Sequence, residues 1–114
     1  MIITKSEPYT KEEIERLLEV FDTYIKTVID IERKICSAGM DRHFEGEQLL
    51  LEKGSRQSDV WGGGIDTETK QVDFNSFINI RSQDDNTSNE IQNKEVRDRY
   101  EKLSTYFFKE LYEQ

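Results

Sequence analysis

Apolar residues at steps of three and four dominate the first third of the chain and limit what it can fold into. They follow Thr10-Lys11-Glu12-Glu13, the pattern of a capping box, in which a hydroxyl and a carboxylate bind free amides where a helix begins. The stripe consists of Ile14, Leu17, Leu18, Phe21, Ile25, Val28 and Ile35, and Ala38-Gly39 follows as a carboxyl-terminal cap. This spacing predicts one long helix of about seven turns.

The second half of this predicted helix is apolar on more than one side. Tyr24, Ile29, Ile31 and Cys36 lie off the main stripe, so the apolar face is wider than one flat sheet would cover. Excess apolar surface on a helix favours association. We therefore expect a protein partner, or a homodimer contact, through this first helix.

Residues 46–81 change to the alternation that is typical of strands. Strands are predicted at 47–52, 57–65 and 71–81, with turns at Lys53-Gly54 and 66–70. Within the second strand, Gly62-Gly63-Gly64 indicates a bulge, a bend or the close approach of another backbone. Three consecutive strands predict an antiparallel meander, to which Ile2-Ile3-Thr4 adds a short fourth strand.

The rest of the chain reads as a loop and a closing helix. Residues 82–92 are polar and show no periodic signal, whereas Asn93 can cap a helix that carries apolar residues at Val96, Tyr100, Leu103, Phe107 and Leu111. The predicted fold is α+β, with the long amino-terminal helix and the carboxyl-terminal helix packed on one face of a three- to four-stranded meander. We expect a single domain over residues 1–114.

Charge and cysteine content narrow the partners and the compartment. Sixteen basic against twenty-four acidic side chains give a net charge of −8, which repels phosphate backbones and anionic membranes, so we expect no nucleic-acid partner. No apolar run approaches the length of a membrane span, so no membrane partner is expected either. Cys36 is the single cysteine and the start of the chain lacks a signal pattern, which predicts a cytoplasmic protein.

One polar and aromatic segment is a candidate binding site. Alternation would place Gln57, Asp59 and Trp61 on one strand face, and pairing with the next strand would bring Asn79 and Arg81 alongside. Such a surface suits a small polar or anionic ligand. The alternative is structural: Asp59 pairs with an arginine, and the indole fills the second face of the sheet.

Other chemistries find less support in the sequence. His43 has Asp41, Arg42 and Glu45 nearby, but no second nitrogen or sulfur ligand at a fixed spacing, so a solvated loop residue is favoured over a metal or acid–base site. Cys36, on the apolar side of its helix, is expected to be a core residue. No metal and no cofactor are predicted.

The chain resembles an uncharacterised family of small prokaryotic proteins, a domain of unknown function. The resemblance rests on Gly54-Ser55-Arg56-Gln57, Asp59-x-Trp61-Gly62 and Ile78-Asn79-Ile80-Arg81, and it runs over nearly the whole chain. It implies no reaction. It does imply a shared set of candidate site residues, namely Arg56, Gln57, Asp59, Trp61, Asn79, Arg81, Asn86 and Ser88.

Three functions are compatible with these patterns. The leading hypothesis is a small binding module that uses the polar and aromatic sheet face for a ligand or a partner. The second is a small hydrolase or transferase, with Asp59 as general acid or base and Arg56 or Arg81 stabilising an anion. The third is an acidic, antitoxin-like inhibitor of a basic partner.

Overall fold

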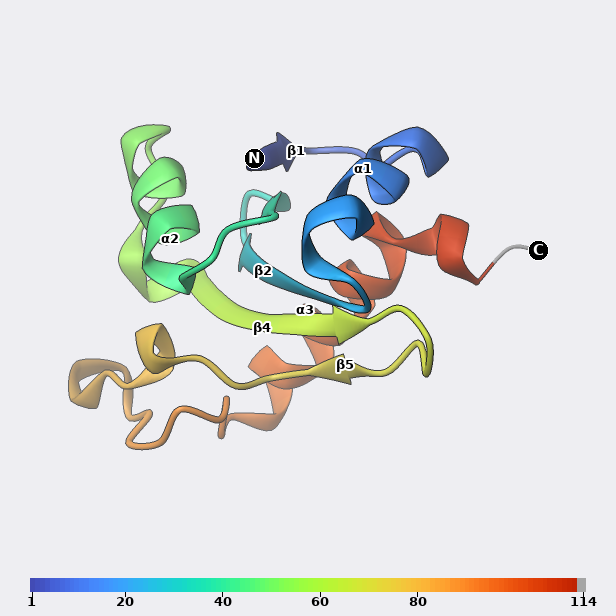
Figure 1. Ribbon diagram of the computed structural model, residues 1–114. Helices are drawn as coiled ribbons and strands as arrows, with labels where there is room; N and C mark the ends of the chain where they lie inside the picture. Colours follow the sequence, from blue (N-terminus) through green and yellow to red (C-terminus); the bar gives the residue numbers. More distant parts are fainter. Residues whose placement is uncertain (113–114) are drawn as a thin grey trace.

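The structure, a computed structural model, describes residues 1–112, so Glu113 and Gln114 of the predicted domain lie outside the described residues. Strands and α-helices follow in the order β1 (Ile3–Lys5), α1 (Lys11–Phe21), β2 (Tyr24–Asp30), β3 (Ile35–Ala38), α2 (His43–Glu52), β4 (Val60–Asp66), β5 (Val72–Asp73) and α3 (Lys94–Phe107). Four short 3-10 helices complete the described part, namely η1 (Gln57–Asp59), η2 (Phe77–Asn79), η3 (Ser82–Asp84) and η4 (Lys109–Leu111). Figure 1 shows their arrangement.

The strands form one antiparallel sheet in the order β1-β3-β2-β4-β5. Its centre is the pair β2 and β4, which stay in register over seven residues from Tyr24 opposite Asp66 to Asp30 opposite Val60. The predicted combination of helices with an antiparallel sheet is confirmed. The predicted meander of three consecutive strands is wrong, because α2 lies between β3 and β4 in the chain.

The predicted long helix is also wrong, because the helix ends at Phe21 and residues 24–38 form the hairpin β2–β3. The capping box of Thr10 and Glu13 is confirmed at its start. Beyond Asp22, whose φ of 61° breaks the helix, β-branched side chains recur and favour extended backbone. Asp30 then fixes the hairpin turn, since its Oδ1 accepts hydrogen bonds from the amides of Glu32 and Arg33 at 3.0 and 2.9 Å.

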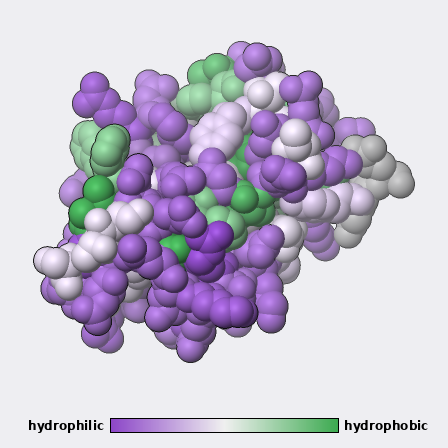
Figure 2. All heavy atoms as spheres, turned by 90° about the horizontal axis from the view of Figure 1, so that it is seen from below, coloured by the Kyte–Doolittle hydropathy of each residue, from purple (hydrophilic) through white to green (hydrophobic). Residues whose placement is uncertain are grey.

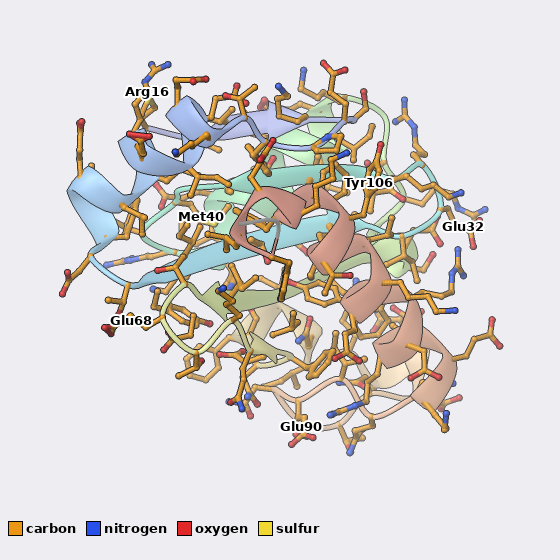
Figure 3. All side chains as sticks on the ribbon, turned by 90° about the vertical axis from the view of Figure 1, so that its right-hand side faces the viewer. Arg16, Glu32, Met40, Glu68, Glu90 and Tyr106 are labelled. Atoms are coloured by element: carbon orange, nitrogen blue, oxygen red, sulfur yellow. The ribbon has the colours of Figure 1, made fainter. Side chains whose placement is uncertain are left out.

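Two cores lie on opposite faces of the sheet. The larger core packs residues of α1 and α3 against the sheet and includes Ile29, Ile31 and Cys36; Figure 3 shows α3 crossing in front of the strands. The smaller core packs α2 against the other face through Val28, Met40, Leu50 and Val60. Of the residues that made the predicted helix too apolar, Ile29 and Cys36 are buried in strands, Ile31 is buried in the hairpin turn and Tyr24 is half-buried in β2. This removes the observation behind the expected homodimer.

The predicted strand at 47–52 is wrong, because these residues belong to α2. Gly46 explains why a helix fits there: a Cβ at this position would lie 2.5 Å from Met40 Cε and 3.0 Å from Val28 Cγ2. Without that atom, α2 lies directly on β2. The helix start is fixed by Glu45, whose Oε1 accepts a 2.9 Å hydrogen bond from the Arg42 amide.

The other two predicted strands are only partly present. Residues 57–59 form η1 and only 60–66 form β4, while β5 covers just Val72 and Asp73 of the expected 71–81. The glycine run forms no bulge, because β4 pairs with β2 without interruption. Close backbone approach is confirmed at Gly63, where a Cβ would overlap the carbonyl of Asp73. The closing helix is confirmed as α3, with Asn93 Oδ1 accepting from the Val96 amide.

Within residues 1–112, no helix is both long and apolar enough to cross a lipid bilayer.

Candidate functional site

The indole of Trp61 lies inside the larger core, with 3% of its surface exposed. The expected polar and aromatic sheet face is therefore wrong, for two reasons. Residues 57–59 form a 3-10 helix, so strand alternation does not align Gln57 and Asp59 with Trp61. The side of β4 that carries Trp61 and Ile65 is covered by the same core that contains Tyr100 of α3.

Arg81 is committed to a structural role beside Trp61. Its guanidinium carbon lies 4.1 Å from the centre of the indole ring, and it donates hydrogen bonds to the carbonyls of Gln57 and Val60. Its Nε lies 3.6 Å from a carboxylate oxygen of Asp84. A buried cation with these partners holds η1, β4 and η3 together.

Asn79 completes the outer edge of β4 where β5 has ended. Its Oδ1 accepts from the amide of Gly62, and its Nδ2 donates to the Gly62 carbonyl, both at 2.9 Å. The same amide group also donates to the carbonyls of Phe74 and Asn89. One buried side chain thus replaces the backbone bonds of a missing neighbouring strand.

Asn86 organises the following loop in the same way. Its Nδ2 donates to the carbonyls of Asn79, Ser88 and Glu90, and its Oδ1 accepts from the amide of Gln92. Both asparagines are buried and use their polar atoms on backbone partners. The polar stretch 82–92 is therefore a tightly bonded support, although it contains no α-helix or strand.

The other candidate residues lie nearer the surface. Arg56 and Gln57 are exposed, and Ser88 Oγ accepts from the Glu90 amide. Asp59 makes no side-chain hydrogen bond to the described residues. Burial and then the nearby charge of Asp30 raise the pKa of its carboxyl group above the ordinary value, while Arg56 opposes this shift. The eight candidates do not converge on one open surface.

A different surface has the form of a binding site. A cleft of about 400 Å³ lies between the start of α2 and η2. Its lining is contributed by β2, the loop before α2, α2 itself and the segment after β5, through Lys26, Asp41, Arg42, His43, Phe44, Ser76, Phe77 and Ile78.

Gly62 shapes the wall of this cleft. A Cβ on Gly62 would lie 2.7 Å from Ser76 Cβ and 3.0 Å from Ile78 Cδ1, so any larger residue would push η2 away from the sheet. The asparagine bonds described above hold the same segment in place, because Asn79 is the last residue of η2. The sequence motif thus acts on the cleft indirectly, by fixing one of its walls.

His43 stands at the first position of α2, inside the cleft. Its Nε2 lies 2.7 Å from the carbonyl oxygen of Gly63. Burial and then the nearby Lys26 lower the pKa of the imidazole, against the opposing effects of the Gly63 bond and the charge of Asp73. The ring is therefore neutral at pH 7.

Two cations border the cleft without an acidic partner. Lys26 Nζ donates to the backbone carbonyl of Asp41 at 2.5 Å, and neither Lys26 nor Arg42 forms a salt bridge within residues 1–112. Both lie near the amino-terminal end of α2, where the helix dipole is positive. The lining therefore carries two positive charges against the one negative charge of Asp41, in a chain of net charge −8.

Large apolar side chains form the rim of the cleft. Phe77 is 83% exposed and Phe44 is about half exposed. In Figure 2 most of the visible face is hydrophilic. Hydrophobic groups stand at the left edge, on the side where Figure 1 places α2 and the segment after β5, and also at the top and in the centre of the view. Exposed aromatic residues beside a cleft indicate a surface that a ligand covers.

The sequence offered partial signals for this site. For His43 the sequence favours a solvated loop residue, because no second nitrogen or sulfur ligand follows at a fixed spacing. Lys26 falls within the predicted long helix and Phe77 within the strand predicted at 71–81, so neither is predicted to be a binding residue. Their convergence depends on the pairing of β2 with β4 and on the turn at η2, neither of which local spacing reveals.

Two further kinds of site, a metal site and a reactive thiol, were considered within the described part of the chain. Residues 1–112 contain no group of three or more His, Cys, Asp or Glu side chains placed to hold a metal ion. Cys36 is fully buried, and burial raises the pKa of its thiol to about 12. Its expected place in the core is confirmed.

Comparison with known proteins yields one family and no individual relative. A family model described as "Protein of unknown function (DUF5674)" matches residues 1–107. No curated protein and no solved structure matches the chain.

Proposed function

Because the chain belongs to the DUF5674 family, whose function is unknown, we propose a function from the geometry alone: it binds a small amphipathic anion in the cleft between α2 and η2. The ligand has an aromatic or branched apolar body and one anionic group, such as a carboxylate or a phosphate. This keeps the predicted small anionic ligand and moves its site from the sheet face to the cleft.

The observation that carries this proposal is the meeting of unpaired cations with exposed aromatic rings. Lys26 and Arg42 supply positive charge without a salt bridge among the described residues, and Phe44 and Phe77 supply apolar area beside them. A ligand with both features would cover the rings and pair with the charges. An apolar ligand would use only the rings, and a plain inorganic anion only the cations.

The other predicted functions keep less support. An enzyme that uses Asp59 is supported by the raised pKa of that carboxyl group, but the residue does not line the cleft. An inhibitor of a basic partner is supported by the net charge of −8. A cytoplasmic location is supported by the single cysteine, which cannot form an internal disulfide.

The test is a fluorescence titration with 8-anilinonaphthalene-1-sulfonate, which combines aromatic rings with one anionic group. The natural chain should bind one equivalent saturably. Phe77→Ser and Lys26→Met should each weaken binding about tenfold, a loss that corresponds to one good contact. Urea denaturation should show that both variants remain folded.

Two matched variants control for general effects of apolar surface and charge. Tyr106→Ser removes an exposed aromatic ring from α3, and Lys94→Met removes an exposed ammonium group from the start of that helix. Both should bind the dye as the natural chain does. Absence of saturable binding, or equal weakening in the controls, would overturn the proposal.

A further inference from the structure

We infer that the ligand of this cleft donates a hydrogen bond to Nδ1 of His43, from an N–H or O–H group that neighbours its anionic group. This inference rests on the proposed function and narrows the ligand class. It follows from how the backbone of β4 fixes the imidazole.

The Gly63 carbonyl determines which imidazole nitrogen carries the proton. A carbonyl oxygen can only accept hydrogen bonds, so at 2.7 Å the Nε2 of His43 must be the donor. In a neutral imidazole the other nitrogen is then a bare acceptor. Nδ1 can therefore accept a hydrogen bond from a donor group of the ligand.

Nδ1 is open for such a bond. It makes no hydrogen bond to residues 1–112, and it is not among the sealed side-chain atoms that lack a partner, such as Trp61 Nε1. His43 belongs to the lining of the cleft. We therefore place the accessible Nδ1 on the cleft side of the ring.

The charged groups around His43 favour the neutral ring. Lys26 on β2 disfavours its protonation and Asp73 on β5 favours it, but Asp73 Oδ2 already accepts a 2.7 Å hydrogen bond from Tyr24. On the side of α2, Arg42 and Asp41 lie next to the ring in sequence and carry opposite charges. Burial is the largest effect on the pKa of the imidazole and lowers it, Lys26 adds to this effect, and the bond to Gly63 opposes it.

These positions define a ligand class. Lys26 takes the anionic group, His43 takes a donor within one or two bonds of it, and Phe77 with its neighbours takes the apolar body. A 2-hydroxy acid or an N-acylated amino acid with an aromatic or branched side chain has this pattern. A simple apolar acid lacks the donor and leaves Nδ1 without a partner.

The experiment compares three probes of nearly equal size by calorimetry at pH 8. They are 3-phenyllactate, which has a hydroxyl donor, its O-methyl ether, which has only an acceptor, and 3-phenylpropanoate, which has neither. We expect phenyllactate to bind about fivefold to tenfold more tightly than the other two, the effect of one hydrogen bond. The ratio to the ether should fall as acid protonates Nδ1 and turns it into a donor.

Two variants separate the hydrogen bond from the shape of the site. His43→Gln can still donate to the Gly63 carbonyl and offer an acceptor, so the preference for phenyllactate should persist and lose its pH dependence. His43→Phe should lose the preference. If the three probes bind equally to the natural chain, or if His43→Phe keeps the preference, the donor inference fails and the cleft remains. If no probe binds, the cleft proposal fails as well.

Discussion

The guanidinium of Arg81 lies over the indole of Trp61, with 4.1 Å between the Arg81 Cζ and the ring centre. Both side chains are buried, and the cation also binds two backbone carbonyls. Two residues that the sequence marked as a ligand surface are thus partners of each other. Their contact joins the motif after α2 to the loop that supports the cleft.

Replacing Arg81 should therefore destabilise the fold strongly. Arg81→Met leaves the carbonyl of Val60 without a donor and leaves the carbonyl of Gln57 with only the Val60 amide, so we expect the free energy of unfolding to fall by about 2 to 4 kcal/mol. Urea denaturation measures this. Arg56→Met, in the same motif but exposed, is the control and should change stability by no more than about 0.5 kcal/mol. Equal effects of the two variants would show that Arg81 does not support the loop.

Replacing Asn79 should destabilise the fold about as much as replacing Arg81, through the edge of β4. In Asn79→Ala the amide and carbonyl of Gly62 lose their partner at the sheet edge, which should cost about 2 to 4 kcal/mol. Amide hydrogen exchange at Gly62 should accelerate more than exchange at Gly64, which lies on the same edge of β4 and is still paired with Asp73 of β5. The exposed Asn75, replaced by Ala, is the matched control. Unchanged exchange at Gly62 would contradict this assignment.

The buried His43 gives stability a defined pH dependence. Its folded pKa is lowered below the ordinary value of 6.5, so between these two values the unfolded chain binds more protons. The contribution of this residue is therefore complete above pH 6.5 and declines as the pH falls toward the lowered value. Comparing the natural chain with His43→Gln by thermal unfolding at pH 8 and pH 5 isolates this contribution. An equal loss in both proteins would contradict it.

Much of the helical architecture at the chain ends was readable from local chemistry. The capping box at Thr10 and the cap at Asn93 are bonds within one helical turn, so spacing alone identifies them. The net charge follows from the composition alone, and the core position of Cys36 was predicted from the apolar residues around it in the sequence. Helix caps can be predicted from a single sequence because both partners of each bond lie within one turn of the chain.

The errors share one cause: apolar periodicity does not separate a helix from strands that face two cores. Ile25 and Val28 lie three residues apart and read as one helical face, but on β2 they face opposite sides of the sheet. Ile25 belongs to the larger core, together with Ile29, and Val28 belongs to the smaller core. The β-branched residues of this segment were the overlooked signal, and Gly46 was the sign that α2 packs directly on the sheet.

The candidate site was misplaced because buried polar residues resemble binding residues in a sequence. Asn79, Arg81 and Asn86 bond the backbone of a loop that has no strand to pair it. Nothing in their spacing distinguishes that role from ligand contact. The residues of the cleft come from segments that meet only after β2 and β4 pair.

Asp59 offers a test of the raised pKa on which the enzyme hypothesis relies. Because its pKa is raised, the ionised carboxylate opposes folding at neutral pH, and Asp59→Asn should slightly raise the midpoint temperature of unfolding. The gain should vanish as the pH falls below the pKa, where the natural carboxyl group is also neutral. A destabilised Asp59→Asn protein would show instead that the carboxylate makes a favourable contact.

The most direct test of the cleft is an NMR titration of ¹⁵N-labelled protein with 8-anilinonaphthalene-1-sulfonate, followed amide by amide. The account predicts that the largest saturable shift changes fall at residues 41–44 and 76–78, on the two walls of the cleft. Amides along α3, on the other face of the sheet, should stay nearly unchanged. Largest changes on α3, or small changes spread over the whole chain, would contradict binding in the cleft.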